Sequence, residues 1–414
     1  MIRLSVAPAN ALSFSLTRTT AEAGDRPARS SLRLTAVLAL LVWLSGSCRS
    51  QSLGDPAADA RIRSGIDFVY NLSFDSARAE FQQVAAAHPD HPAGYFFLAM
   101  VDWWRIVTDI GNTSYDERFL SQLDRVVELC EEKLDRNESD LTALFYKGGA
   151  LGFQGRLYGN RGDWVKAANA GRNALPIVQE TYRLAPSNND VLFGIGIYNY
   201  YAEIIPEQFP FVKPFMFFFP KGDKLKGISQ LRKSSTEAHY ANIEATYFLL
   251  QLLFTFEKQY TEALPLAARL HALYPNNVLF HRYVGRIYAA TGAWDRTAEV
   301  FEEILENVGR KKAGYDATVE RESRYYIGLH QMNERGYEKA LASFYRCDEL
   351  SRSLDREEFS GFMILANLKV GMIYDLQGKR DLATRQYDKV LALKDYQAAH
   401  QQAEQYQKSP YTKP

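Results

Sequence analysis

A pattern that recurs at intervals of 34 to 43 residues constrains the fold of this chain more than any other feature. Shifting the stretch Leu250–Leu270 by 34 residues superimposes its apolar positions on those of Val284–Ile304. Other copies keep a Gly, a small residue and an aromatic residue at the same offsets: Gly65, Ala77 and Phe81; Gly285, Thr297 and Phe301; Gly328, Ala340 and Phe344; Gly371, Ala383 and Tyr387. Tandem units of this length predict a stack of similar helical elements.

The offsets fit a pair of antiparallel helices. The Gly in the first helix lets a neighbouring helix approach closely, and the next two positions lie one turn apart on the second helix, facing the first. A proline ends the second helix because it cannot continue one; the examples are Pro89, Pro186 and Pro275. Short turns join the two helices, and each contains a turn-forming glycine: Gly292, Gly336 and Gly378.

These residues resemble the tetratricopeptide repeat, and the resemblance covers most of residues 58–394. It implies an all-α fold, an α-solenoid of stacked antiparallel helix pairs whose core is a continuous strip rather than a ball. Residues 93–135 and 139–186 read as two longer pairs. Residues 395–414 supply a capping helix and a tail. The repeat positions are expected to serve packing, so they indicate no catalysis.

Residues 1–47 read as a leader segment, and residues 48–57 as a linker. The apolar stretch Leu34–Leu44 follows Arg29 and Arg33 and precedes small residues, which is typical of a secretory signal. The order before Cys48 resembles a bacterial lipoprotein box, which implies lipidation of Cys48. Plain signal cleavage and an uncleaved anchor stay open as alternatives. We therefore expect a cell-envelope protein of a bacterium, periplasmic or attached to the outer membrane, with membrane attachment through the N-terminus.

Charge and cysteine content narrow the classes of partner. Lys plus Arg and Asp plus Glu are both 49, and the leader holds five basic and two acidic residues, so the rest of the chain is mildly acidic. A nucleic-acid binder that works through bulk charge needs a basic excess, so we expect no nucleic-acid partner. Beyond the leader, Cys130 and Cys347 occupy apolar helix positions and are expected to be buried thiols, although a disulfide stays open.

An aromatic insertion, residues 202–222, interrupts the repeat. Four prolines between Tyr198 and Asp223 oppose a regular helix across this segment. Its phenylalanines either cover the solenoid groove or form an exposed interaction patch; those proposed to bind a partner are Phe211, Phe215, Phe217, Phe218 and Phe219. Asp223 is expected to cap the following helix.

A second, weaker resemblance covers residues 190–390. Its residues are Gly194 to Tyr198, Ile205-Pro206, Gly222-Asp223, Gly227 and Leu231. They are similar to the central region of the tetratricopeptide repeat 39 family. This resemblance implies a repeat protein of adaptor type without established catalytic chemistry.

Motifs of catalysis do not stand out in the sequence. It contains no H-E-x-x-H, G-x-S-x-G or C-x-x-C motif. His271 and His281 flank a helix–helix loop with no acidic cluster between them. Trp103 and Trp104 are adjacent, so one is expected in the core and the other in the groove or at a helix interface. We expect no enzyme, no cofactor and no metal.

The solenoid groove is the expected site of function. Repeat positions predicted to face it are Arg282, Arg286, Tyr325, Leu329, Met332, Leu368 and Met372. Arginines suit a carboxylate, and Tyr and Met suit apolar side chains. The favoured hypothesis is a scaffold or adaptor that binds a protein or peptide in the groove. The alternative is an apolar small molecule or lipid in a cavity lined by the Phe-rich insertion. Packing of the groove residues against their neighbours also stays open.

Overall fold

The computed structural model describes residues 53–208, 213, 220–355 and 359–412. Within these ranges the chain forms 17 helices and no strand, so the expected all-α class is confirmed. The first four pairs are α2 (Pro56–Tyr70) with α3 (Phe74–Ala87), α4 (Pro92–Thr108) with α5 (Asp116–Leu134), α6 (Leu141–Asn160) with α7 (Trp164–Leu184), and α8 (Val191–Gln208) with α10 (Lys224–Glu237).

Four more pairs and a last helix complete the stack. The pairs are α11 (Asn242–Thr255) with α12 (Tyr260–Leu273), α13 (Val278–Ala290) with α14 (Trp294–Gly309), α15 (Ala317–Asn333) with α16 (Tyr337–Leu354), and α17 (Gly361–Leu376) with α18 (Arg380–Leu391). Helix α19 (Ala399–Lys408) packs on α18 and caps this end. Each helix packs mainly on its neighbours in sequence, which defines an α-solenoid.

The repeated glycines have a more specific role than close helix approach. A Cβ on Gly285 would lie 2.7 Å from the Phe301 ring, and one on Gly371 would lie 2.5 Å from the Tyr387 ring. Gly65 with Phe81 and Gly328 with Phe344 show the same contact. The glycine therefore makes room for the aromatic ring of its own repeat, 16 residues later.

The turns inside the pairs share one backbone feature. Two residues before the second helix, the chain adopts a left-handed conformation at Leu72, Gly162, Lys258, Gly292, Arg335 and Gly378. Three of these six residues are glycines, which tolerate positive φ without strain. In the turn before α16, the left-handed residue is Arg335 with φ 60°, whereas Gly336 has φ −78°. The expectation that Gly336 forms this turn was wrong by one residue.

Helix α8 extends further than the prolines suggested. It runs to Gln208 and includes Pro206, so residues 202–208, the start of the insertion expected to be irregular, are helical. Pro206 lies in the last turn, where little of the helix remains to be disrupted.

Asp223 caps α10 as expected, because its carboxylate accepts the Lys226 backbone N–H at 2.9 Å. Gly222 is needed for close approach, since a Cβ there would lie 2.3 Å from the Asn199 carbonyl oxygen.

The first half of the solenoid closes on itself. Tyr274 at the end of α12 donates a hydrogen bond to Asp67 of α2 at 2.8 Å, across 207 positions of sequence. Asp59 of α2 accepts a hydrogen bond from Tyr240, just before α11. Buried side chains from α2 to α13 form one hydrophobic cluster, and two smaller clusters follow toward α19. In the second half of the solenoid the core is a strip, as expected. In the first half the buried side chains are arranged around the middle of the closed turn.

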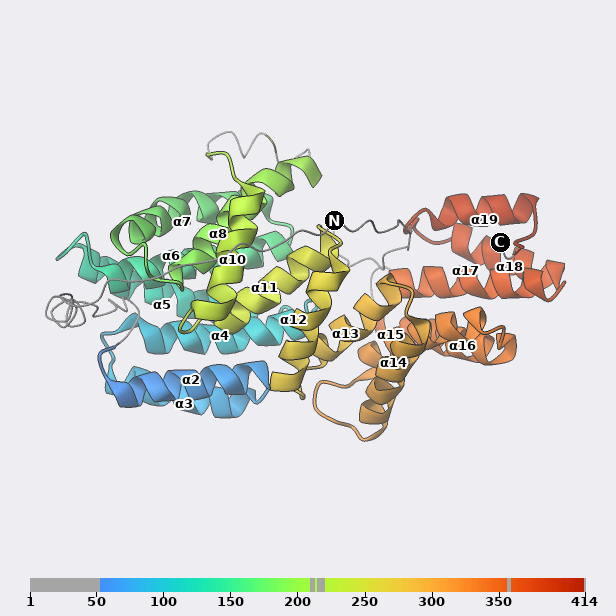
Figure 1. Ribbon diagram of the computed structural model, residues 1–414, viewed down its shortest axis with the longest axis horizontal. Coiled ribbons are helices and arrows are strands. Elements are labelled where there is room, and N and C mark those ends of the chain that lie inside the picture. The colour runs from blue at the N-terminus through green and yellow to red at the C-terminus, as the bar shows by residue number, and fades with distance from the viewer. Residues whose placement is uncertain (1–52, 209–212, 214–219, 356–358, 413–414) are drawn as a thin grey trace, which may run out of the picture.

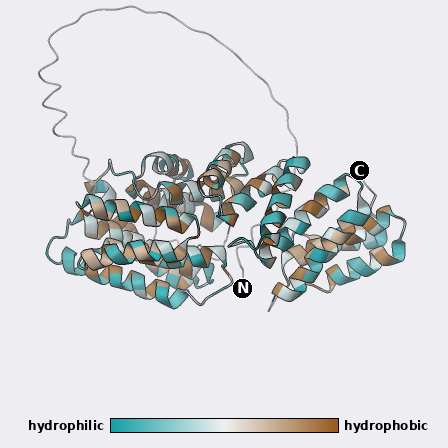
Figure 2. Ribbon diagram, turned by 90° about the horizontal axis from the view of Figure 1, so that it is seen from below, coloured by the Kyte–Doolittle hydropathy of each residue, from teal (hydrophilic) through white to brown (hydrophobic). Residues whose placement is uncertain are grey.

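The overall shape follows from this closure. Figure 1 shows α2 to α12 gathered at one end of the long axis and α17 to α19 at the other. Figure 2 shows hydrophobic and hydrophilic residues alternating around the helices, as expected for helices that bury one face. No helix of the described ranges combines the length and the apolar character that crossing a membrane requires.

Candidate functional site

A cavity of about 1560 Å³ occupies the inside of the closed turn. Inner faces of α2, α4, α6, α8, α11 and α13 line it, and residues of α7, α15 and α17 extend it. Its wall is rich in aromatic side chains, among them Trp103, Trp104, Phe193, Tyr247, Phe248 and Tyr283. These elements are mainly the first helices of successive pairs, so the repeat itself places their side chains on the inner surface.

Helix α6 contributes a wall of glycines. Gly148, Gly149, Gly152, Gly155 and Gly159 all line the cavity. A Cβ on Gly152 or Gly159 would meet no heavy atom within 4 Å, so packing against protein does not require these two glycines. Each glycine in a helix interior costs about 1 kcal/mol relative to alanine. The wall therefore leaves space in the cavity at a cost in helix stability.

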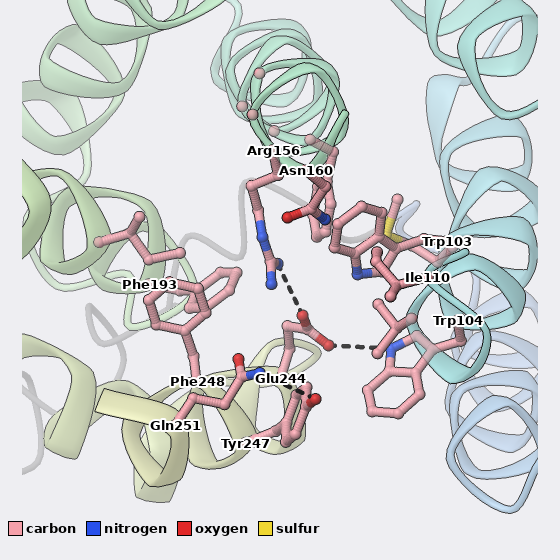
Figure 3. Close-up of a pocket in the computed structure, with 18 of the residues that line it drawn as sticks. Trp103, Trp104, Ile110, Arg156, Asn160, Phe193, Glu244, Tyr247, Phe248 and Gln251 are labelled. Carbon is pink, nitrogen blue, oxygen red and sulfur yellow. Dashed lines mark hydrogen bonds and ion pairs between the residues drawn. The ribbon is translucent and has the colours of Figure 1, made fainter. Parts of the chain in front are cut away.

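Glu244 of α11 is buried in the cavity wall and bonds to side chains of three other helices; Figure 3 shows its bonds to Arg156 and Trp104. Its Oε2 accepts hydrogen bonds from the Trp104 indole N–H at 3.1 Å and the Tyr70 hydroxyl at 3.2 Å. Its Oε1 accepts one from Arg156 Nη1 at 3.0 Å. Burial and the Glu244 carboxylate raise the pKa of Tyr70 well above its usual value, so Tyr70 stays a donor. These bonds tie α2, α4 and α6 to α11.

Arg156 extends from α6 into the cavity between aromatic rings (Figure 3). Its guanidinium carbon lies 4.6 Å from the Trp103 ring centroid and 5.0 Å from that of Phe248. A cation over ring faces at such distances is attracted by their negative electrostatic potential. The charge of Arg156 is thus balanced by Glu244 and by the rings.

A second charged cluster lies where α13 meets α15. Arg282 and Arg286, one turn apart on α13, both donate to the carboxylate of Glu322. The Arg282 Nε–Oε2 distance is 2.8 Å, and the Arg286 Nη2–Oε2 distance is 2.7 Å. Burial alone would raise the pKa of Glu322, but the two guanidinium groups outweigh it and hold this pKa at about 2. Both arginines line the cavity, as the groove hypothesis expected.

The other predicted groove residues of the described ranges lie elsewhere. Tyr325, Leu368 and Met372 are buried among neighbouring helices, and Leu329 and Met332 pack against the same clusters. Tyr325 has its ring 5.6 Å from that of Phe362 on α17. Because α15 and α17 pack directly together, these five residues fill helix interfaces. Of the predicted residues that the structure describes, Arg282 and Arg286 line the cavity and the other five do not.

The remaining predicted site residues lie outside the described ranges. They are Cys48, Phe211, Phe215, Phe217, Phe218 and Phe219. On α8, Tyr198 and Tyr201 just before the insertion and Ile205 at its start line the cavity. Of the two adjacent tryptophans, neither is left open to solvent: Trp103 and Trp104 are each 1% exposed. Both are core residues that also border the cavity, because helices pack on both sides of α4.

The structure brings His271 and His281 together with Glu303, which the sequence did not suggest. The two imidazole rings stack with centroids 4.1 Å apart and planes 14° apart, so their in-plane lone pairs run parallel instead of converging on one point. Burial, the neighbouring His271 and Lys312 lower the pKa of His281 to about 3. The arrangement is a stacked neutral pair in a helix interface.

Cys130 and Cys347 are buried free thiols, and burial raises the pKa of each to about 12.

Sequence reasoning missed most of the cavity residues. Glu244 is the one acidic residue in the otherwise apolar stretch of α11, and five glycines recur in α6; both were available as signals. No signal in the sequence indicates that these residues meet in one wall, because Glu244 lies 88 residues from Arg156 and 140 from Trp104.

Comparison with known proteins supports the repeat class. The family model described as tetratricopeptide repeat matches residues 62–101 and 251–314. These segments span α2 to α4 and α11 to α14, including two of the Gly and aromatic pairs. The chain therefore contains tetratricopeptide repeats, and its fold is an α-solenoid built from them. Repeats of this class are scaffolds for interactions with other molecules.

Several solved structures are similar to this chain, each at low sequence identity. The C-terminal part of a TPR repeat-containing protein from Cytophaga hutchinsonii is 15% identical, with 71% of this chain and 96% of that chain covered and a TM-score of 0.34. Yeast Tom70 is 12% identical, with coverage of 85% and 95% and a TM-score of 0.28. The human IFIT1 dimer with PPP-AAAA is 13% identical, with coverage of 85% and 84% and a TM-score of 0.39. No curated protein matches the sequence significantly.

Proposed function

We propose that this chain is a non-catalytic scaffold that holds an extended, mainly apolar segment of a partner polypeptide in its inner cavity. The observation that carries this proposal is the size and extent of the cavity. At about 1560 Å³ it exceeds the roughly 300–1,000 Å³ usual for small-molecule pockets, and its lining continues from α2 to α17. A cavity that follows successive repeats suits an elongated ligand better than a compact one.

The lining chemistry supports a ligand of mixed character. Aromatic side chains such as Phe193, Phe248 and Tyr283 offer large apolar contact area. Gly152 and Gly159 let a ligand approach the backbone of α6 closely. The charged groups of Arg156 and Glu244 satisfy each other, so they orient polar groups of a ligand without demanding a charged one.

A site-specific photocrosslink tests this proposal. Phe193 of α8, inside the cavity, is replaced by the photoreactive p-benzoylphenylalanine, which keeps an aromatic side chain. The matched control carries the same residue at Leu382 on α18, which is exposed and outside the cavity lining. Irradiation in cells should link one contiguous segment of a partner to position 193 and none to position 382. Crosslinks that form only at position 382 would show that the partner binds the outer surface.

An apolar small molecule or lipid is the second candidate, and one observation favours it. The bonds Tyr274–Asp67 and Tyr240–Asp59 close the turn, so part of the cavity is walled on several sides. Enclosure of this kind suits a ligand that enters whole. Native mass spectrometry of the purified chain, followed by solvent extraction, should then release a bound lipid at close to one equivalent. A protein of the bare chain mass would count against this candidate.

We also propose a cell-envelope location with a lipid on Cys48. The apolar stretch Leu34–Leu44, the preceding arginines and the small residues before Cys48 support it. Globomycin, which inhibits lipoprotein signal cleavage, should shift the wild-type chain to a larger precursor. The control Cys48→Ser should show no globomycin-dependent shift. An unchanged wild-type chain in the treated cells would refute lipidation.

A further inference from the structure

The cluster of Arg282, Arg286 and Glu322 does not balance its own charge. Two guanidinium groups share one carboxylate, and no other ion pair of either arginine is found among the described residues. The side chains of Arg282 and Arg286 are 14% and 13% exposed, and Glu322 is fully buried. One positive charge is therefore left in a largely desolvated wall, where an unpaired charge is costly.

This contrasts with the other two arginines that line the cavity. Arg156 pairs with Glu244, and Arg321 pairs with Asp355 at 2.7 Å, each one to one. The lining also contains two acidic residues, Asp109 and Asp190, and Asp190 accepts hydrogen bonds from backbone N–H groups of residues 239–241. Among the arginines of the lining, those that share one carboxylate are therefore on the inner face of α13. Two hydrogen bonds from Arg286 and two from Arg282 reach Glu322 through their Nε and Nη2 atoms. The Nη1 group of each has no partner in the part of the chain that the structure describes, so it is available to an anion.

An apolar path starts next to this cluster. Arg286 lies over the Tyr283 ring at 5.8 Å. Tyr283 contacts Tyr247 with ring centroids 6.1 Å apart, and Tyr247 contacts Trp104 at 5.2 Å. All three rings line the cavity. A single positive charge at one point of an aromatic cavity is complementary to a molecule with one anionic group and a long apolar part.

We propose that the cavity binds an anionic amphiphile, a long-chain monocarboxylate in its simplest form, whose head group lies on Arg282 and Arg286 and whose chain follows Tyr283, Tyr247 and Trp104. The proposal rests on the second candidate function above, because it specifies the chemistry of a small molecule or lipid in the same cavity, and it does not depend on the partner polypeptide. A chain that captures no polypeptide at position 193 can still bind the amphiphile, and the reverse also holds.

Competition binding on the purified chain tests the inference. The fluorescent carboxylate 11-(dansylamino)undecanoic acid serves as the reporter, and dodecanoate, dodecanol and dodecylamine compete with it below their micelle concentrations. Dodecanoate should displace the reporter at least about tenfold more effectively than dodecanol, since hydrogen bonds to two charged donors strengthen binding. Dodecylamine should be the weakest of the three. Equal displacement by the acid and the alcohol would overturn the proposal.

Three variants separate the local charge from the net charge of the chain. Arg286→Gln should weaken dodecanoate about tenfold and leave dodecanol unchanged. Glu322→Gln, which adds positive charge at the same place, should strengthen dodecanoate. The control Arg232→Gln removes the same charge on α10, where Arg232 pairs with Glu262 outside the cavity, and should change neither. Far-UV circular dichroism checks that each variant is folded, and Arg282→Gln replaces Arg286→Gln if the latter does not fold. A folded Arg286→Gln or Arg282→Gln variant with unchanged dodecanoate binding would refute the head-group assignment.

Discussion

At the scale of single residues, the interior of the first half of this chain is organised around Glu244, a buried carboxylate that three side chains satisfy. Glu244 accepts hydrogen bonds from Tyr70, Trp104 and Arg156, which come from three different helices. Removing the donors of such a carboxylate leaves a buried acceptor without partners, and removing the carboxylate leaves its buried donors without an acceptor, so either change is costly. The inner wall therefore depends on Glu244 more than on any single aromatic ring.

Replacing Glu244 with alanine should cost about 3–5 kcal/mol of unfolding free energy, because it leaves the Arg156 charge and two other donors without their acceptor. Urea unfolding followed by circular dichroism measures the change. The control Glu262→Ala breaks the half-exposed ion pair with Arg232 and should cost at most about 1 kcal/mol. If both substitutions cost the same, the buried bonds of Glu244 contribute no special stability.

His281 should make the fold sensitive to mild acid. Its folded-state pKa is about 3, below its ordinary value of 6.5, because burial and then His271 and Lys312 disfavour the cation. The unfolded chain takes up the proton first, so the stability from neutral His281 is complete above pH 6.5 and is lost progressively as pH falls from 6.5 toward 3. The expected slope is about 1.4 kcal/mol per pH unit for one proton.

The variant His281→Gln measures this contribution. Between pH 5.5 and 4 its unfolding free energy should depend less steeply on pH than that of the wild type, by about 1.4 kcal/mol per unit. Urea unfolding at several pH values gives both slopes. Identical slopes in the two proteins would mean that His281 is protonated in the folded chain as readily as in the unfolded one.

At the scale of elements, the repeated turn is the feature that sets each helix pair. The left-handed residue two places before the second helix reverses the chain, and glycine accepts this conformation without strain. Leu72, Lys258 and Arg335 adopt it at a cost of roughly 1–2 kcal/mol each. The solenoid thus contains several positions where stability was not maximised.

Glycine substitutions in these turns should act in opposite directions. Arg335→Gly should raise the unfolding free energy by about 1 kcal/mol, since it relieves the positive φ. Gly292→Ala should lower it by a similar amount, and no neighbouring atom within 4 Å adds a steric effect there. The control Gly336→Ala, one residue from Arg335 and at negative φ, should change it by less than about 0.5 kcal/mol. Chemical denaturation ranks the three variants; a destabilised Arg335→Gly would show that its side chain stabilises the turn.

The helix pairs were predictable because their defining contacts are local. Gly285 and Phe301 lie 16 residues apart and meet inside one pair, so the sequence offset carries the contact itself. The neighbours of Tyr325 were predicted less well, because the repeat rule assumes an open groove that the direct packing of α15 and α17 fills. The start of the insertion was expected to be irregular, but α8 continues to Gln208 because Pro206 falls in its last turn.

At the scale of the whole molecule, closure of the first half distinguishes this chain from a solenoid whose units contact only their neighbours. Tyr70 reaches Glu244 across 174 positions and Asp67 reaches Tyr274 across 207. No local pattern encodes such contacts, so the cavity could not be predicted from the repeat. The position of Arg282 and Arg286 on the inner face could be predicted, because both occupy repeat positions that face inward. Closure also implies that a destabilising substitution spreads further through the first half than through the second.

Hydrogen exchange should reveal this difference. Ile62→Ala in α2 creates a cavity at a fully buried site, for which a loss of about 2–5 kcal/mol is typical. Because α2 contacts α11 to α13, amides of those helices should exchange faster together with those of α2 and α3. Val390→Ala in α18 is the comparison, and its effect should stay within α16 to α19, where each helix packs only on near neighbours. Mass spectrometry of peptic fragments resolves both patterns. If faster exchange in Ile62→Ala stops at α4, the bonds across the turn are too weak to couple its ends, and the cavity would then open without unfolding any helix.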